Sequence, residues 1–374
     1  MTILDVKALT VGAFRQNQLG YPALEIHFHV NAGEFLGIVG ESGSGKTITT
    51  LALLGLEPLQ PGTLTGEVTF RFNHKPVNIL SDLPRFVEQK NGTVKKKIFS
   101  WRNHVYKQVK PLLKNNVAYL LQDGHKTLNP FLRIDTQMLE ILWRKHHNGR
   151  TDFWKHWPRI QFFNTAEKKR LLEEARQLFL AVNLRDPDKV LHAYPHELSG
   201  GMAQRVSIAL ALARKPRFVI LDEPTSGLDV TLQAALIELI QSLKHKFQLS
   251  GIIISHDLYF VSQLADTIAV MYSGQIWERG PAHQVIHPEY PWKHPYTKFL
   301  LDRLELGFSR TGHFNNNIWN RAQSGCPIRE SCPVYNANAH PELNRRCNAQ
   351  HPPMVTVAKG HWIRCWQFAG REWQ

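Results

Sequence analysis

The sequence predicts an α/β fold with a mostly parallel core sheet, followed by a small domain that contains cysteines. Three observations lead to this prediction. Short apolar runs, typical of buried strands, alternate with stretches of helical period, which is the pattern of a parallel sheet covered by helices. A glycine-rich loop of the phosphate-binding type joins one such strand to one such helix. After about residue 281 the alternation ends in a tail rich in Pro, His, Asn and Cys.

The individual elements follow from the spacing of apolar residues. Residues 1–6 have the pattern of a first strand, and residues 24–30 alternate strictly, as a half-buried strand does. Further strands are expected at residues 35–39, 67–72, 117–121, 218–221, 251–254 and 267–271. Helices are expected at residues 48–56, 171–182, 200–214 and 230–247. Residues 123–193 lack strand signals.

Length and composition restrict the class of protein. A chain of 374 residues has room for one large α/β domain and a smaller second unit, and its apolar fraction of 43% supplies a core. No run of eighteen or more apolar residues occurs, and the first residues lack the basic-then-apolar order of a signal peptide. We therefore expect a protein that stays in the cytoplasm.

The formal net charge of +14 is confined to two segments. Residues 84–114 hold nine Lys or Arg and one acid, and residues 144–170 hold eight Lys or Arg and two acids. The rest of the chain is therefore neutral. The basic character belongs to these two segments and not to the fold as a whole.

The most specific motif is a loop that fits the phosphate-binding pattern G-x-x-x-x-G-K-[ST]. Its glycines allow a tight turn that points backbone N–H groups at phosphate oxygens, and the following helix adds the positive end of its dipole. Lys46 is expected to reach the β- and γ-phosphates, and Thr47 to offer its hydroxyl to Mg²⁺. The nucleotide-binding candidates are Gly40, Glu41, Ser42, Gly43, Ser44, Gly45, Lys46 and Thr47.

Two acids end a second buried strand. Asp222 and Glu223 come directly after the apolar run at residues 218–221. An Asp in this place can hold the Mg²⁺ shell, and a neighbouring Glu can orient and polarise the attacking water. A phosphate loop alone could be a chance match, whereas the loop and the acids in this order predict an NTPase.

Three further motifs accompany the loop and the acids. Ser199, Gly200 and Gly201 open a helix, where a hydroxyl and backbone N–H groups form a second anion site. Asp229 follows the acids, and His256 ends a later strand, where it can contact the γ-phosphate. An isolated histidine after a strand is usually ordinary surface. In this ordered series it is a candidate for the nucleotide site.

Together these motifs resemble the ATP-binding subunit of ABC transporters, from the first strand to about residue 280. The resemblance implies an ABC-type ATPase that binds ATP and Mg²⁺, with an antiparallel β subdomain and a helical subdomain at about residues 124–200. It also implies that the domain closes head to tail on a second ATPase. Each ATP then lies between the phosphate loop of one chain and the signature motif of the other.

Roles follow from the same resemblance. Glu223 corresponds to the catalytic base, His256 to the switch histidine, and Asp229 to the acid of the D-loop. Gln122 corresponds to the residue that senses Mg²⁺ and the membrane partner. The Mg²⁺ ligands are then Thr47, Gln122 and Asp222, and the signature motif is Ser199, Gly200 and Gly201. For the adenine-stacking aromatic residue the sequence offers Phe14, with Tyr21 as the alternative.

Three segments resemble one subfamily, the ATPases of dipeptide, oligopeptide and nickel importers. They are residues 39–47, 198–205 and 294–297, and Met202 is similar to the residue of the first, D-type, subunit. This implies a second, F-type ATPase as partner, two transmembrane permease subunits and, indirectly, a substrate-binding protein. It places the ATPase domain at residues 1–285 and a C-terminal domain of the oligopeptide-permease type at residues 286–374.

All four cysteines, Cys326, Cys332, Cys347 and Cys365, lie in the last fifty residues. In a reducing cytoplasm such a group suggests a metal site before it suggests disulfides. The tail resembles the four-cysteine tail of these ATPases, which is associated with an iron–sulfur cluster in some members, although the fourteen residues between Cys332 and Cys347 are about twice the usual spacing. We expect a [4Fe–4S] cluster, with Zn²⁺ or free buried thiols as alternatives.

Two regions depart from the subfamily. The basic segments, at about residues 84–114 and 144–170, look like insertions with interleaved aromatic residues. They are interpreted as solvated surface loops, as contacts to anionic lipid headgroups, or, with less support, as contacts to nucleic acid. Gly124 stands where the subfamily commonly has Pro, and we expect it to loosen the loop after Gln122.

The resulting hypothesis is an ATP-hydrolysing, energy-coupling subunit of a peptide-type ABC importer. Such a subunit would be peripheral on the cytoplasmic face of the inner membrane. Nickel, metal chelates and antimicrobial peptides are alternative cargoes. A soluble ABC ATPase that acts on nucleic acid is the rival class, which the single ATPase domain and the permease-like tail disfavour.

Overall fold

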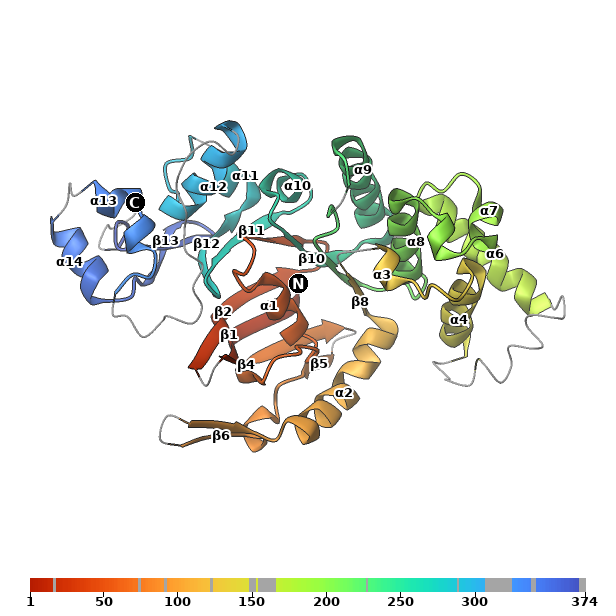
Figure 1. Cartoon of the computed structure of the whole chain (residues 1–374), viewed down its shortest axis with the longest axis horizontal. Helices are drawn as coiled ribbons and strands as arrows, with labels where there is room; N and C mark the ends of the chain where they lie inside the picture. Colours follow the sequence, from red (N-terminus) through yellow and green to blue (C-terminus); the bar gives the residue numbers. More distant parts are fainter. Residues whose placement is uncertain are drawn as a thin grey trace. The chain divides into compact units, whose positions relative to one another are not determined.

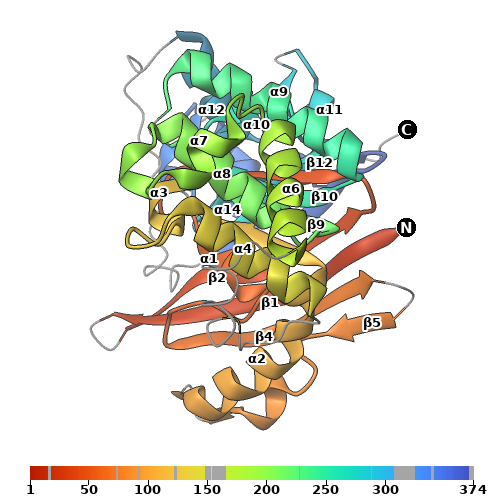
Figure 2. The same ribbon diagram turned by 90° about the vertical axis from the view of Figure 1, so that its right-hand side faces the viewer.

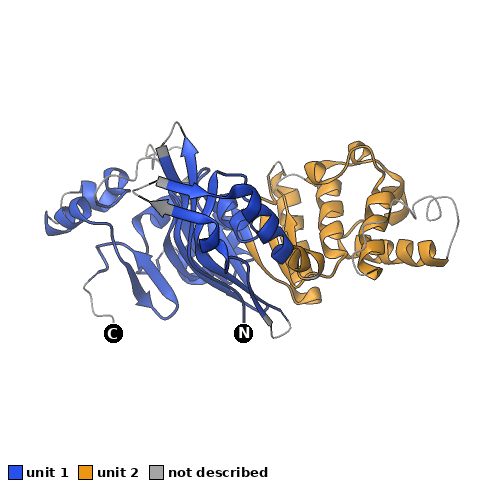
Figure 3. Ribbon diagram, turned by 90° about the horizontal axis from the view of Figure 1, so that it is seen from below, with its two compact units in different colours: residues 1–109, 253–374 blue, residues 110–252 orange. Residues whose placement is uncertain are grey.

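The computed structural model describes residues 1–15, 18–72, 75–90, 93–121, 124–147, 153, 166–226, 228–287, 289–306, 325–337 and 341–369. The chain divides into two compact units, coloured in Figure 3. Unit 1 comprises Met1–Val109 and Ile253–Gln374, and unit 2 comprises Lys110–Ile252. Within the described residues, no helix is both long enough and apolar enough to span a membrane.

Unit 1 contains an antiparallel sheet with the strand order β2-β1-β4-β5. Its strands are β1 (Thr2–Arg15), β2 (Gln18–Asn31), β4 (Pro61–Phe72) and β5 (Lys75–Asn78). The first two are longer than the sequence pattern indicated, because they pair with each other along most of their length despite several register shifts. Their buried side chains include Leu4, Leu9 and Ile26.

The second sheet of unit 1 carries the phosphate loop. β3 (Phe35–Val39) runs parallel to β11 (Thr267–Tyr272), and the strand order is β13-β14-β12-β11-β3-β10. The other strands are β10 (Ser250–Ser255), which extends into unit 2, β12 (Gln275–Pro281), β13 (Met354–Ala358) and β14 (His361–Arg364). The C-terminal hairpin therefore continues this sheet through the antiparallel pairing of β14 with β12.

Short helices complete unit 1 (Figure 1). They are α1 (Lys46–Ala52), α10 (Leu258–Ser262), α11 (Ala282–Ile286), α12 (Pro295–Leu306), η3 (Arg329–Ser331), α13 (Pro333–Asn336) and α14 (Pro341–Ala349). Large side chains that are almost completely buried, such as Phe35, Tyr272 and Trp277, fill the core of this unit.

The first basic segment is ordered, and its interpretation as a solvated loop is wrong. It forms η1 (Leu83–Arg85), a hairpin of β6 (Val87–Lys90) and β7 (Thr93–Lys96), and α2 (Ile98–Asn115). Trp101, Val105 and Val109, spaced four residues apart, are buried, and they form the inner face of α2. Lys107 and Lys110 stand on the exposed outer face of α2, whereas Lys96 points inward and its Nζ donates to the carbonyl oxygen of Thr63 (2.6 Å).

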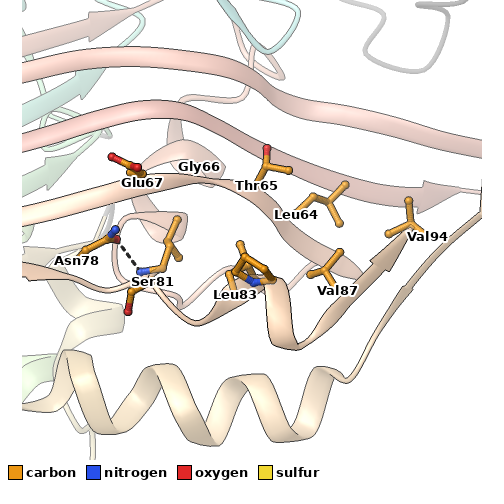
Figure 4. A pocket seen from close by; sticks show the side chains of 11 residues that line it. Leu64, Thr65, Gly66, Glu67, Asn78, Ser81, Leu83, Val87 and Val94 are labelled. Atoms are coloured by element: carbon orange, nitrogen blue, oxygen red, sulfur yellow. Dashed lines mark hydrogen bonds between the residues drawn. The ribbon is translucent and has the colours of Figure 1, made fainter. Parts of the chain in front are cut away.

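A cavity of about 380 Å³ lies where this segment meets the antiparallel sheet (Figure 4). Apolar side chains from β4, from η1 and from the hairpin line it, among them Leu64, Leu83 and Val94. Asn78 closes one side, and its Oδ1 accepts hydrogen bonds from the backbone N–H groups of Val68 and Leu80. The cavity lies beside a direct contact between the hairpin and the sheet, in which Lys96 Nζ of β7 donates to the carbonyl oxygen of Thr63 on β4 (2.6 Å).

Unit 2 combines a pair of parallel strands with a group of helices. β8 (Val117–Leu120) pairs with β9 (Phe218–Asp222), with Val117 opposite Phe218. The helices are α3 (Gly124–Thr127), α4 (Ile134–His146), α6 (Ala166–Ala181), α7 (Pro187–His192), η2 (Pro195–Glu197), α8 (Gly200–Leu212) and α9 (Val230–Phe247). Figure 2 shows α4, α6, α7 and α8 packed together.

The predicted fold class is confirmed. The chain has an α/β fold with parallel core strands, an antiparallel β part and a helical part. The face predicted for the helix at residues 171–182 is the buried one, since Leu171, Ala175 and Phe179 are inaccessible to solvent. The domain boundary at residues 285 and 286 stays a prediction, and the residues after it belong to unit 1 by their contacts.

Candidate nucleotide-binding site

The phosphate loop joins β3 to α1 in unit 1, as predicted. Two of its glycines are required by space and by backbone conformation. Gly45 has φ 101°, and a β-carbon there would lie 1.8 Å from the carbonyl oxygen of Pro22. Gly40 has φ 155°, and a β-carbon there would lie 2.1 Å from the carbonyl oxygen of Met271. The loop is therefore held against β2 and β11 by contacts that admit only glycine.

Two side chains of the loop are suited to an anion. Lys46 is 6% exposed, and its Nζ donates to the carbonyl oxygens of Gly40 (2.7 Å) and Glu41 (3.0 Å). Ser44 is fully buried, and its hydroxyl has no hydrogen-bond partner among the described residues. An ammonium group and an unpaired hydroxyl beside inward-turned backbone amides fit the phosphate groups of a nucleotide. Thr47 is exposed at the start of α1.

The two acids lie at the end of β9 in unit 2. Asp222 is 4% exposed, and its Oδ2 accepts a hydrogen bond from the hydroxyl of Tyr119 on β8 (2.8 Å). Glu223 has φ 47°, a left-handed conformation that non-glycine residues rarely adopt. Such strain gathers at functional sites, where the surrounding structure maintains it.

The signature and D-loop candidates are helix caps in unit 2. Ser199 is the N-cap of α8, and its Oγ accepts the N–H of Met202 (3.3 Å). Asp229 is the N-cap of α9, and its Oδ1 accepts the N–H of Leu232 (2.9 Å). A β-carbon on Gly200 would meet nothing within 4 Å, so the start of α8 is open to a bound group.

The remaining candidates are placed as follows. His256 is exposed, directly after β10 in unit 1. Phe14 is 49% exposed near the end of β1, whereas Tyr21 is half-buried on β2, next to the proline whose carbonyl oxygen lies against Gly45. Gln122 lies outside the described residues. The loop and His256 belong to unit 1, and the two acids, Ser199 and Asp229 belong to unit 2.

Gly124 lies in a close contact between two helices, and the looser loop expected after Gln122 stays a prediction, because residues 122 and 123 lie outside the described residues. Gly124 begins α3, and a β-carbon there would lie 2.7 Å from the backbone nitrogen of Gln204 on α8. Its carbonyl oxygen accepts a hydrogen bond from the hydroxyl of Ser207 (2.9 Å). The glycine allows α3 and α8 to approach each other closely.

The four cysteines are free thiols, two of them buried and two half-buried. Burial is the largest cause that raises the pKa of all four, to about 12 for Cys365. Neighbouring thiols also raise the pKa of Cys326, Cys347 and Cys365, so the cysteines share one region of the tail. In the part of the chain that the structure describes, however, no group of three or more His, Cys, Asp or Glu side chains could hold a metal ion. The predicted iron–sulfur cluster is not supported by this arrangement.

Sequence reasoning missed three side chains that contact candidate residues. Tyr119 bonds to Asp222, and Tyr296 and Arg303 of α12 bond to Glu41 in the phosphate loop. Residues 294–297 were recognised as a subfamily motif, but the motif alone did not indicate what it touches. Contacts between residues more than 250 positions apart leave no periodic signal in a single sequence.

The comparisons with known proteins agree with this geometry. The ABC transporter family model matches residues 24–226. The chain is 35% identical to the dipeptide transport ATP-binding protein DppD of Haemophilus influenzae, over 92% of both chains. It is 37% identical to the oligopeptide transport ATP-binding protein OppD of Bacillus subtilis, over 80% of this chain and 71% of that one.

A solved structure shows the same fold. A dimeric bacterial ABC transporter cassette aligns with a TM-score of 0.54 at 19% identity, over 75% of this chain and 99% of that one. ATP hydrolysis coupled to transport is the activity of the family. The chain therefore belongs to the ABC transporter family and, within it, to the ATP-binding proteins of dipeptide and oligopeptide transport.

Proposed function

We propose that this chain couples ATP hydrolysis to peptide import, as one of two unlike ATPase subunits attached to two transmembrane permeases. The observation that carries the proposal is the phosphate loop, with its buried Lys46 and unpaired Ser44 hydroxyl, in a chain similar to dipeptide transport proteins along almost its whole length. A substrate-binding protein delivers the peptide to the permeases in this scheme. The ATPase itself is peripheral, on the cytoplasmic face of the inner membrane.

The proposed roles are those that the resemblance implies. The loop amides and Lys46 hold the phosphates, and Phe14 or Tyr21 stacks on the adenine. Thr47, Asp222 and Gln122 are the ligands for Mg²⁺, which supplies charge neutralisation at the phosphates when bound. Glu223 acts as the general base, and His256 contacts the γ-phosphate. The residues that contact the nucleotide bound by the partner ATPase are Ser199, Gly200, Gly201 and Asp229.

Reconstitution tests this function. The chain, its partner ATPase, the two permeases and the binding protein are placed in liposomes, and uptake of a labelled dipeptide is followed with and without ATP. We expect ATP-dependent uptake that is lost in a Lys46→Ala complex. Nickel uptake without peptide uptake would assign the alternative cargo, and ATP hydrolysis without any uptake would reject the transport role.

The proposal also includes contact between the first basic segment and anionic lipid. The exposed residues of α2 include Phe99 (84% exposed) and Tyr106 (54%), together with Arg102 and Lys107. Basic side chains attract anionic headgroups by about 1 kcal/mol each near the surface, and exposed aromatic rings suit the interface. The second segment lies largely outside the described residues.

Co-sedimentation with liposomes tests the lipid contact. Binding to vesicles with anionic lipid should weaken as salt is raised, because screening shortens the range of the attraction. Arg102→Glu with Lys107→Glu should reduce it at least severalfold. Lys215→Glu with Lys359→Glu, an equal charge change at exposed residues elsewhere, is the matched control. Equal binding by both double variants contradicts the proposal.

The metal group at the cysteines stays a prediction from the resemblance. Its support is that all four cysteines lie in one region of the tail, namely Cys326, Cys332, Cys347 and Cys365. Because burial raises their pKa values, the thiols must lose protons when a metal binds. Iron, sulfide and zinc are measured on anaerobically purified protein. Iron and sulfide support [4Fe–4S], zinc alone supports the alternative, and a preparation without metal contradicts both.

A further inference from the structure

The phosphate loop includes a carboxylate beside the place where a polyanion must bind. Glu41 follows the first glycine of the loop, and Lys46 already donates to its carbonyl oxygen. A carboxylate here repels the phosphates of a nucleotide unless a cation offsets its charge. The chain supplies that cation from α12, more than 250 residues away in the sequence.

Two contacts join α12 to Glu41. Arg303 Nη1 lies 2.9 Å from Glu41 Oε1, with both side chains about one quarter exposed. The hydroxyl of Tyr296 accepts the backbone N–H of Glu41 (3.1 Å). Tyr296 is fully buried, and the guanidinium of Arg303 stands 4.8 Å from the ring centre of Phe299, so both groups are held by their own helix.

The start of α12 is fixed in turn by a buried carboxylate. Glu278 of β12 is fully buried; its Oε2 accepts the N–H of His294 (2.8 Å), and its Oε1 lies 2.8 Å from Nε2 of His361 on β14. His294 Nδ1 accepts the N–H of Tyr296 (3.1 Å). A chain of contacts within unit 1 therefore runs from the C-terminal hairpin to the phosphate loop.

We propose that Arg303 and Tyr296 are positioning residues for ATP binding, which act through Glu41. Arg303 offsets the charge of the Glu41 carboxylate next to the incoming phosphates, and Tyr296 fixes the backbone of the loop at the same residue. The inference rests on the proposed ATP site and goes beyond it, because it gives the C-terminal segment a function at the nucleotide. Neither residue touches ATP in this scheme.

The test is ATP affinity, measured by titration of the full-length chain with a fluorescent ATP analogue and Mg²⁺. Arg303→Ala should weaken binding about five- to tenfold, since the positive charge of Arg303 no longer offsets the Glu41 carboxylate beside the phosphates. Adding Glu41→Gln to this variant should bring the affinity back to within about twofold of the original chain. The loss in Arg303→Ala should also shrink at high salt. Tyr296→Phe should weaken binding about two- to threefold.

The controls separate positioning from folding. Arg303→Lys keeps the charge and should bind ATP nearly as well as the original chain, and melting temperatures are compared for every variant. Unchanged affinity in Arg303→Ala overturns the proposal, and so does a loss that Glu41→Gln does not reverse, since that loss would be structural. Lys46→Ala is the control for loss of the nucleotide site, and this variant should bind no ATP. If the original chain also bound no ATP, the proposed nucleotide site would be wrong, and not only the role of Arg303.

Discussion

Glu223 combines a strained backbone with a place at the end of a buried strand. Its φ of 47° lies in the left-handed region that non-glycine residues rarely adopt. If Glu223 is the general base, Glu223→Gln should reduce ATP turnover by about a hundredfold or more, since general bases contribute typically 10²- to 10⁴-fold. Nucleotide binding should stay within about twofold. ATP turnover is measured as phosphate release by the assembled complex, and nucleotide binding is measured by titration.

A matched control exists on the surface. Glu67 on β4 is exposed, and Glu67→Gln makes the same chemical change far along the chain from any candidate residue. It should leave turnover unchanged. Turnover near the original level in the Glu223 variant would remove Glu223 from its assigned role, whatever its backbone conformation.

His294 makes stability depend on pH. Its side chain is 1% exposed, and its Nδ1 must stay unprotonated to accept the N–H of Tyr296. Burial lowers its pKa from 6.5 to about 3. At pH values between about 3 and 6.5, His294 is protonated in the unfolded chain and unprotonated in the folded chain. The free energy of unfolding should therefore fall by up to about 1.4 kcal/mol per pH unit as pH drops below about 6.5.

His294→Asn isolates this effect, because the Asn carbonyl oxygen can accept the same N–H without titrating. Urea unfolding of both proteins at several values between pH 7 and 4 gives the two slopes. The variant should be less stable at pH 7 but less sensitive to acid. Identical slopes would assign the acid sensitivity to other groups.

Several of the candidate side chains could be found from sequence because each stands in a local motif. The loop, the acids after β9 and the helix caps are defined by neighbours within a few residues. Tyr119 and Arg303 could not be found in this way, since each acts through a partner that the fold brings near. Their importance follows from contacts and not from spacing.

At the scale of elements, α2 shows how composition can mislead. Its sequence is basic enough to suggest a loop, yet Trp101, Val105 and Val109 repeat every four residues and are buried. The basic residues between them occupy the outer face of the helix. Strands β1 and β2 extend beyond their apolar pattern for a related reason, since pairing between strands supports residues that have no strong preference of their own.

The contact between α3 and α8 provides a prediction at this scale. Gly124→Ala places a β-carbon 2.7 Å from the backbone of Gln204, which cannot move away as the end of a side chain could. We expect a loss of about 1–3 kcal/mol in the free energy of unfolding, the usual cost of overpacking. Gly200→Ala, where a β-carbon meets nothing, is the control for stability. Equal stability of both variants would show that α3 adjusts freely.

At the scale of the whole molecule, the order of the motifs along the chain predicts the fold class. Strand, loop and helix, followed later by the signature, the acids and the histidine, are sufficient to predict the α/β core. The order of the motifs does not predict where the C-terminal segment after residue 285 packs. Pairing of β14 with β12 brings the C-terminal hairpin onto the sheet, and the ion pair of Arg303 with Glu41 joins residues 262 positions apart.

The last prediction concerns the number of chains in one active site. The resemblance implies that the phosphate loop of this chain faces the signature motif of a partner, so one chain holds halves of two sites. The isolated chain should bind ATP but hydrolyse it at less than about a tenth of the rate of the mixed complex. Titration with the second ATPase, followed by phosphate release, should restore turnover with a plateau at one partner per chain. Full turnover by the isolated chain, unchanged on dilution, would mean that Lys46 and Glu223 act on one nucleotide without help from a second subunit.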